Sequence, residues 1–257
     1  MVDMAKSHSE RELFTTSVNT KYGKISYNKN EDGIGGVLST GVHWDADIID
    51  NYLKSIVEKS NVILDIGAHI GCHSIAYAKI NPQAIILAFE MQAEMYHYLK
   101  INLADNNITN VKPYCNAVGN CEGEFETEIK LRDGGYYKPV QYFTNDKFNF
   151  GGLGLGIGGA KVKMIRIDDL HFDKCDFIKI DVEGFEYGVL LGAIETIKKY
   201  KPIIFYEYAD KYMTPEMCNI AKIPYDEYNP KSILLDLGYN EFDTSIKGNV
   251  IASYKKI

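Results

Sequence analysis

Cysteine and tryptophan are scarce in this sequence, which has five cysteines and one tryptophan among 257 residues. The cysteine number is odd and no two form a C-x-x-C pair, which argues against a disulfide framework or a zinc knuckle and favours a reducing, cytoplasmic location. The sequence also lacks an apolar run of membrane-spanning length and an apolar signal core. Because it has no basic run and a net charge of -7, we do not expect a nucleic acid partner.

The remaining composition is that of a folded domain, with 46% hydrophobic and 25% charged residues. We expect a flexible N-terminus over residues 1–16 and a single domain over residues 17–257. Residues 121–163 interrupt the pattern of the domain with alternating charged and aromatic residues, followed by many glycines at 151–159. This predicts an insertion with a β-hairpin and a glycine-rich loop, which either closes over a substrate or is a surface connection.

The stretch VILDIGAHIG, residues 62–71, predicts a cofactor-binding turn between a buried strand and a helix. Glycine lets the backbone approach a ligand, and free N–H groups at a helix N-terminus favour an anion. The spacing is D-x-G-x-x-x-G, because His69 and Cys72 replace the second and third glycines of the nicotinamide-binding fingerprint. His69 and His73 also have a spacing that suits zinc, but no third ligand is evident. The cofactor contacts expected here are Asp65, Gly67, Ala68, His69, Gly71 and His73.

Acidic side chains stand at or near the ends of successive predicted strands: Asp65, Glu90, Asp181, Glu183 and Glu207. Ligands of an open parallel sheet gather at the carboxyl ends of its strands, so we expect these acids along one edge. Glu90 ends the second strand, where a carboxylate accepts hydrogen bonds from both hydroxyls of a ribose. Met91, beside Glu90, and Asn116 and Ala117, after the third strand, are expected to complete the nucleoside site.

The order of the predicted elements indicates an α/β fold. Apolar runs at residues 62–66, 84–89, 111–115, 176–180 and 202–206 alternate with helical patterns. This alternation predicts a mostly parallel, twisted sheet with helices on both faces. A final hairpin over residues 241–254 would add an antiparallel last strand.

Several motifs together resemble the FkbM family of S-adenosylmethionine (SAM) dependent methyltransferases. They are VILDIGAHIG, AFE, NAVG, DFIKIDVEGFE, KPIIFYE, IPY, LGY and NVIAS, over residues 47–253. The resemblance implies a Rossmann-like methyltransferase fold, SAM as the cofactor and methyl transfer to a hydroxyl oxygen, often of a sugar or another small molecule. Two residues depart from the family pattern, which usually has asparagine at His69 and proline at Met91.

The resemblance and the strand-end acids together predict an O-methyltransferase acting on a small molecule or a glycan. Asp181 is the first candidate for a general base, followed by Glu207 and Glu183, with His43 as an outsider. The carboxylates of Asp181, Glu183 and Glu207 can instead hold a divalent cation, Mg²⁺ or Mn²⁺. A SAM-binding module without turnover and a nicotinamide-dependent oxidoreductase are the alternative functions. The sequence predicts neither the identity of the acceptor nor the oligomeric state.

Overall fold

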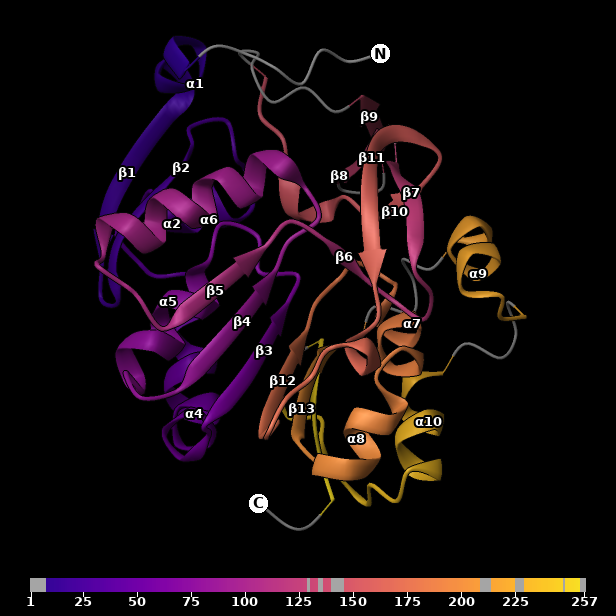
Figure 1. The fold of residues 1–257 in the computed structure, drawn as a ribbon. Coiled ribbons are helices and arrows are strands. Elements are labelled where there is room, and N and C mark those ends of the chain that lie inside the picture. The colour runs from indigo at the N-terminus through magenta and orange to yellow at the C-terminus, as the bar shows by residue number, and fades with distance from the viewer. Residues whose placement is uncertain are drawn as a thin grey trace.

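A seven-stranded sheet forms the centre of the computed structural model, which describes residues 8–128, 130–133, 136–139, 146–208, 214–224, 229–246 and 248–254 (Figure 1). Its strands are β3 (Val62–Ile66), β4 (Ile85–Phe89), β5 (Val111–Tyr114), β12 (Phe177–Ile180), β13 (Ile203–Glu207), β14 (Glu241–Asp243) and β15 (Asn249–Ser253). They lie in the order β14-β15-β13-β12-β3-β4-β5. Five neighbouring strands of this sheet are parallel, namely β13, β12, β3, β4 and β5. Strand β15 is antiparallel to both of its neighbours. The predicted parallel sheet with an antiparallel last strand is confirmed.

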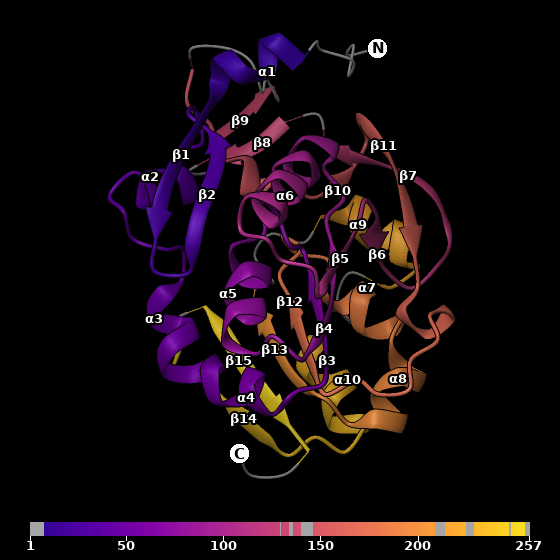
Figure 2. The ribbon, with the colours of Figure 1, turned by 60° about the vertical axis from the view of Figure 1, so that its left-hand side comes forward.

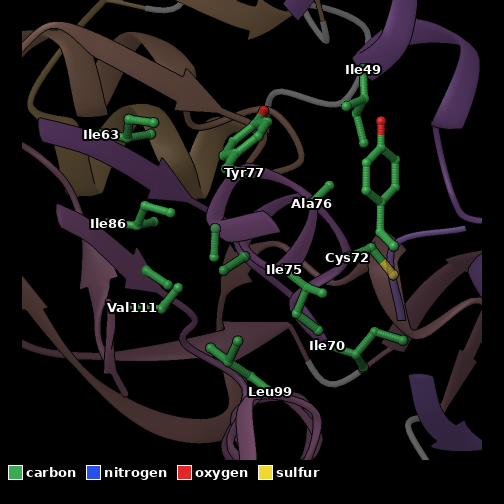
Figure 3. Packing of buried hydrophobic residues seen from close by; sticks show 14 of the residues in the cluster. Ile49, Ile63, Ile70, Cys72, Ile75, Ala76, Tyr77, Ile86, Leu99 and Val111 are labelled. Carbon is green, nitrogen blue, oxygen red and sulfur yellow. The ribbon is translucent and has the colours of Figure 1, made fainter. Parts of the chain in front are cut away.

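Helices cover both faces of this sheet, which explains why its central strands are continuous apolar runs. One face packs against α4 (Lys54–Lys59), α5 (Cys72–Ile80) and α6 (Ala93–Asp105), and the other against α7 (Glu186–Leu191), α8 (Ile194–Tyr200) and α10 (Pro230–Asp236). In β3, Ile63 belongs to the first core and Leu64 to the second, as the alternation of a strand requires. Figure 3 shows residues of the first core, in which Ile63, Ile86 and Val111 lie in a row on the neighbouring strands β3, β4 and β5.

The N-terminal part of the chain lies against α6 (Figure 2). Its elements are α1 (His8–Phe14), β1 (Thr15–Thr20), β2 (Gly23–Asn28), α2 (Ile34–Leu38), α3 (Ala46–Ile48) and a π-helical turn (Ile49–Leu53). Asn102 of α6 accepts a hydrogen bond from the Ser26 backbone N–H of β2 (2.7 Å), and Arg11 pairs with Glu94 at 3.0 Å. The segment predicted to be flexible up to residue 16 therefore contains a helix and the start of a strand from His8 onward. Residues 1–7 lie outside the described residues.

The insertion forms a second, smaller sheet beside the central one. Its elements are β6 (Ala117–Val118), β7 (Gly123–Glu128), β8 (Lys130–Asp133), β9 (Tyr136–Pro139), a 3-10 turn (Phe150–Gly152), β10 (Leu155–Gly156) and β11 (Gly158–Ile165). The smaller sheet has the order β10-β7-β11-β6, and β8 and β9 form a separate antiparallel hairpin, as predicted. The glycine-rich segment expected as a loop instead contributes the 3-10 turn, β10 and the start of β11. A further 3-10 turn (Ile167–Asp169) leads back toward the central sheet, and α9 (Pro215–Ala221) packs on β10.

Asp168 of that last turn caps helix α8. Its carboxylate accepts hydrogen bonds from the backbone N–H groups of Glu195 (3.1 Å) and Thr196 (2.8 Å) in the first turn of α8. Helix N-termini leave such N–H groups without intrahelical partners, so this contact stabilises α8.

Within the described ranges, the helices are too short or too polar to cross a lipid bilayer.

Candidate active site

A cavity of about 280 Å³ lies at the carboxyl ends of the central strands, between the sheet and the insertion. We call its side at the strand ends the sheet wall, defined by Ile66, Gly67, Phe89, Glu90, Asp181 and Glu207. We call its opposite part the loop wall, defined by Gly33, Ile34, Asn149, Gly151, Gly152 and Leu153. The glycine turn after β3 and the corner after β12 thus border the same hollow, as expected for an open parallel sheet.

Gly67 and Gly71 are required by close approaches within the protein. Both have positive φ angles, 77° and 90°. A Cβ atom on Gly67 would lie 1.7 Å from the carbonyl oxygen of Asp181, and one on Gly71 would lie 2.5 Å from Leu99. The sequence correctly indicated tight backbone geometry, but the atoms that exclude a side chain belong to the neighbouring strand end and helix α6, not to a ligand.

Glu90 is positioned to receive hydroxyl groups from a ligand in the cavity. Its side chain is buried, and its carboxylate accepts hydrogen bonds from the backbone N–H groups of His69 (2.8 Å) and Gln92 (2.7 Å), one on each oxygen. Each carboxylate oxygen has more than one acceptor site, so both retain capacity for a further hydrogen bond. Burial raises the pKa of Glu90 to about 7, against the lowering effect of the two backbone donors.

His69 presents an uncharged imidazole to the same cavity. It has a left-handed backbone conformation, with φ of 50°, which histidine and asparagine adopt more often than most residues. Both ring nitrogens are buried without a hydrogen-bond partner among the described residues. Burial lowers the pKa of His69 to about 4, so the ring is neutral near pH 7 and offers one donor and one acceptor. Orphaned buried nitrogens at a cavity wall indicate a polar ligand.

Three acids form a compact group at the other end of the cavity, and we call Asp181, Glu183 and Glu207 the acid cluster. One carboxylate oxygen from each lies within 4.8 Å of the others, and all three side chains are partly buried. Glu183 has a positive φ of 56°, a strained conformation that is concentrated at functional sites. Buried Glu186 holds this corner because its Oε1 accepts the N–H groups of Val182 (3.1 Å) and Gly184 (3.2 Å). The predicted meeting of these acids at one sheet edge is thus present.

Asp65 lies behind the sheet wall and does not line the cavity. It is fully buried, and its carboxylate accepts a hydrogen bond from Ser74 (2.5 Å) and lies 3.4 Å from the ammonium of Lys179. The direct cofactor contact predicted for Asp65 does not fit this position. Lys179 was missed by the sequence analysis, although a lysine within the apolar run of β12 is a signal of a buried ion pair.

The other predicted site residues fall into two groups. Met91, Asn116 and Ala117 line the cavity, and their predicted contact with a cofactor stays a prediction. Ala68, Gly71 and His73 do not line it. His73 is buried with Nε2 3.6 Å from Asp45, and burial lowers its pKa to about 3. Its contacts are those of a packed helix residue, and within the described ranges the acid cluster is the one group with three candidate metal ligands.

His43, the outside candidate for a general base, is held by structural contacts. Its Nδ1 lies 2.8 Å from the hydroxyl of Thr20, and its Nε2 lies 3.0 Å from the carbonyl oxygen of Cys72. The side chain is buried and is absent from the cavity wall. A general base needs a ring nitrogen within reach of the substrate, so His43 does not fit this role.

The loop wall contains part of the glycine-rich segment, for which closure over a substrate was one of two expectations. The buried acid that organises this wall was not anticipated from the sequence. Glu31 accepts hydrogen bonds from the backbone N–H groups of Gly33 and Phe150, each at 2.9 Å. The side chain of Gln92 donates a hydrogen bond to the carbonyl oxygen of Phe150 at 2.9 Å. This bond links the loop to the segment that follows Glu90. Burial raises the pKa of Glu31 to about 7. Trp44, the single tryptophan, also lines the cavity.

Comparison with known proteins matches the sequence model of the "Methyltransferase FkbM domain" over residues 65–230, more than half of the chain. A curated relative, "Methyltransferase sdnD" of Sordaria araneosa, is 28% identical over 162 residues, covering 52% of this chain. The aligned part spans 60% of that relative's length.

Two solved structures are among those to which this chain is similar. The crystal structure of Methyltransferase FkbM from Methylobacillus flagellatus has 16% identity and a TM-score of 0.47, covering 76% of this chain and 44% of that one. A putative caffeoyl-CoA O-methyltransferase from Staphylococcus aureus has 13% identity and a TM-score of 0.46, covering 86% and 91%. Both likenesses are too distant to indicate a ligand or a substrate for this chain.

Proposed function

The chain belongs to the FkbM methyltransferase family, and we propose that it transfers the methyl group of SAM to a hydroxyl oxygen of a small-molecule or carbohydrate acceptor. The observation that carries this proposal is that one cavity is lined by both Glu90 and the acid cluster. One end of the cavity has the features of a nucleoside site, and the other has carboxylates able to accept a proton. The free cysteines of the chain support the proposal of a reducing, cytoplasmic setting for the protein.

The residues at the Glu90 end fit the groups of SAM. The buried carboxylate of Glu90 would accept the two ribose hydroxyls with its remaining acceptor sites. Met91, Asn116 and Ala117 would border the adenine. His69 would hydrogen-bond the amino acid part through one of its ring nitrogens, which have no partner among the described residues. An asparagine-like role for a neutral histidine agrees with its left-handed backbone.

The acid cluster would orient the acceptor and receive its proton. SAM supplies a methyl group on a positively charged sulfur that is already a good leaving group. Holding the acceptor oxygen in line with this group contributes on the order of 7–11 kcal/mol. Asp181 would accept the hydroxyl proton as the new carbon–oxygen bond forms, an effect of roughly 10²–10⁴-fold. Glu183 and Glu207 would hold other hydroxyls of the acceptor.

A divalent cation is the second arrangement that the acid cluster permits. Oxygen ligands from several carboxylates suit Mg²⁺ or Mn²⁺, and such an ion would lower the pKa of a hydroxyl bound to it. In that arrangement the three carboxylates would hold the ion, and the proton of the acceptor hydroxyl would leave to solvent. Addition of EDTA separates the two arrangements, because it abolishes transfer only if the ion is required.

The test is a screen of hydroxylated acceptors with SAM carrying a labelled methyl group, with and without EDTA. We expect label in a methyl ether of a sugar or another alcohol. Titrations with SAM and NAD, followed through the fluorescence of Trp44, test the cofactor separately. Binding of NAD alone would favour an oxidoreductase, and SAM binding without transfer to any acceptor would favour a binding module. If Asp181→Ala and Glu207→Ala leave both binding and transfer unchanged, the proposed site is wrong.

A further inference from the structure

Lys179 is a buried lysine in the middle of a central strand, where apolar residues are the rule. Its side chain is 2% exposed, and its neighbours in β12, Ile178 and Ile180, are buried in the second core. Burying an ammonium group is costly unless it is paired and hydrogen-bonded. A lysine at this position therefore needs hydrogen-bond acceptors or opposite charges around its ammonium group.

Three oxygen atoms surround the ammonium of Lys179. It donates a hydrogen bond to the carbonyl oxygen of Gly67 at 2.7 Å and lies 3.4 Å from carboxylate oxygens of both Asp65 and Asp181. The Gly67 carbonyl thus accepts a hydrogen bond from the ammonium, and the two carboxylates lie at ion-pair distance from it. Burial alone would lower the pKa of Lys179, but the charges of Asp181 and Asp65 raise it above its usual value. The ammonium is therefore charged.

The histidines near Asp181 do not supply this positive charge. His69 and His73 are both electrostatically coupled to Asp181, and burial lowers their pKa values to about 4 and about 3. Both are neutral near pH 7. Lys179 is consequently the cation shared by two carboxylates, that of the fully buried Asp65 and that of Asp181, which lines the cavity.

We propose that Lys179 is a positioning residue for methyl transfer, which fixes the carboxylate of Asp181 relative to the glycine turn. The inference rests on the proposed role of Asp181. Strand pairing already places the two backbones together, since the Asp181 N–H donates to the Ile66 carbonyl oxygen at 3.1 Å. The Asp181 side chain is 38% exposed, however, and strand pairing alone does not fix its rotamer.

The contact with Lys179 selects one orientation of that side chain. The ammonium faces Oδ2 of Asp181 and the Gly67 carbonyl at once, so it ties the carboxylate to the turn that lines the cofactor end of the cavity. Asp181 remains exposed enough to receive a substrate proton. Because a displacement of about 1 Å can reduce a rate by roughly 10²-fold, loss of this contact should affect turnover more than binding.

The experiment must separate positioning from simple stability. Lys179→Met alone would leave the buried carboxylate of Asp65 without a cation, which is strongly destabilising and can prevent folding. Removing both charges, in Lys179→Met/Asp65→Asn, avoids this problem. The matched reference is Asp65→Asn, which keeps Lys179 beside Asp181. Lys179→Arg tests whether another cation restores the function.

Three readouts are taken: the dissociation constant of SAM, the initial rates of labelled methyl transfer to the screened acceptor mixture, and the crystal structures of Asp65→Asn and of the double variant. Relative to Asp65→Asn, we expect the double variant to bind SAM within threefold but to transfer methyl groups about 100-fold more slowly. In Asp65→Asn, Oδ2 of Asp181 should stay near Nζ at the 3.4 Å observed here, and in the double variant it should turn away. Lys179→Arg should retain more transfer than the double variant.

Equal transfer rates in Asp65→Asn and the double variant, or an unmoved Asp181 carboxylate, would overturn the positioning role. Parallel losses of SAM binding, transfer and thermal stability would also contradict it, because they indicate a purely structural lysine. The proposed function fails separately, if the unaltered protein does not bind SAM or if Asp181→Ala transfers methyl groups at the normal rate. In that case the role of Lys179 falls with it.

Discussion

The two walls of the cavity are built by different kinds of interaction. The sheet wall follows from backbone pairing: β3, β4 and β12 are parallel neighbours, so their ends bring Gly67, Glu90 and Asp181 to one edge. The loop wall joins two segments more than 100 residues apart, and the buried side chains of Glu31 and Gln92 hold Phe150 within it. One wall depends on strand register. The other depends on these polar contacts and on the apolar side chains of Phe148, Phe150 and Leu153, which are buried in the first core.

This difference assigns separate tasks to the two walls. Register in this sheet is strongly specified, because a slip of one residue would exchange the side chains that fill the two cores. The sheet wall therefore provides fixed positions for chemistry. The described residues of the loop wall form no strand ladder comparable to that of the central sheet, so we expect this wall to open at a lower free energy than the central strands and to be the part that admits a ligand. Variants in each wall should consequently give different kinds of defect.

The largest effect is expected from Asp181 in the sheet wall. Asp181→Asn keeps the size of the side chain but removes the proton acceptor, so the rate of methyl transfer should fall roughly 10²–10⁴-fold. SAM binding should stay within a few-fold of normal. The measurement compares turnover of labelled SAM with the dissociation constant from Trp44 fluorescence. An equal loss in both quantities would mean that Asp181 serves binding and not chemistry.

Glu90, also in the sheet wall, should show the opposite pattern. Glu90→Gln removes the charge and replaces one carboxylate oxygen by an amide nitrogen. This nitrogen cannot accept the hydrogen bond that the backbone N–H of His69 or Gln92 now donates. Hydrogen bonds to a charged group contribute about 1.5–3 kcal/mol each, so SAM affinity should fall on the order of 100-fold. Glu58→Gln, on the exposed surface of α4, is the matched control. Undiminished affinity in Glu90→Gln would remove the ribose role from this residue.

The affinity for SAM should depend on pH through the same carboxylate. Burial raises the pKa of Glu90 to about 7, so the group is ionised above this pH and protonated below it. Because the ionised form is the better acceptor for ribose hydroxyls, affinity should fall as the pH is lowered, by about tenfold from pH 8 to pH 6. Calorimetric titrations across this range provide the measurement. Glu90→Gln should flatten the profile; a slope that persists in this variant would assign it to another group.

The loop wall should give the smallest of these losses of function and the clearest effect on local opening. Glu31→Ala removes the acceptor of the Gly33 and Phe150 N–H groups. We expect this to destabilise the closed loop wall by about 1 kcal/mol. If SAM binds only to the closed form, its affinity should fall roughly fivefold. Hydrogen exchange at the Phe150 amide should become faster, whereas amides of β3 should be unaffected. Glu31→Gln, which keeps one acceptor oxygen, is the control. Equal exchange in all three proteins would contradict the anchoring role of Glu31.

The sequence predicted the sheet wall well because strand periodicity and strand ends are local signals. The apolar runs located the strands, and the acids after them located Glu90 and the acid cluster. The same alternation could have corrected Asp65, since it shares the Ile63 face of β3 and therefore points toward α5. Lys179 pairs with Asp65 in register, so a lysine within FIKI was a readable signal of their ion pair.

The loop wall was not predictable for a physical reason. Its contacts, such as Glu31 with Phe150, join residues 119 positions apart and leave no periodic trace in the sequence. The glycine-rich segment indicated only that the backbone was unconstrained by propensity. Which residues it would meet depends on how the insertion sheet docks, and one sequence does not determine that.

The most direct test of the account is a crystal structure of the protein with S-adenosylhomocysteine, the product that remains after methyl transfer. The account predicts the ribose hydroxyls within hydrogen-bond distance of Glu90, an amino acid group beside His69, and the sulfur atom facing Asp181. A ribose bound to another residue, or a sulfur atom turned away from the acid cluster, would contradict it.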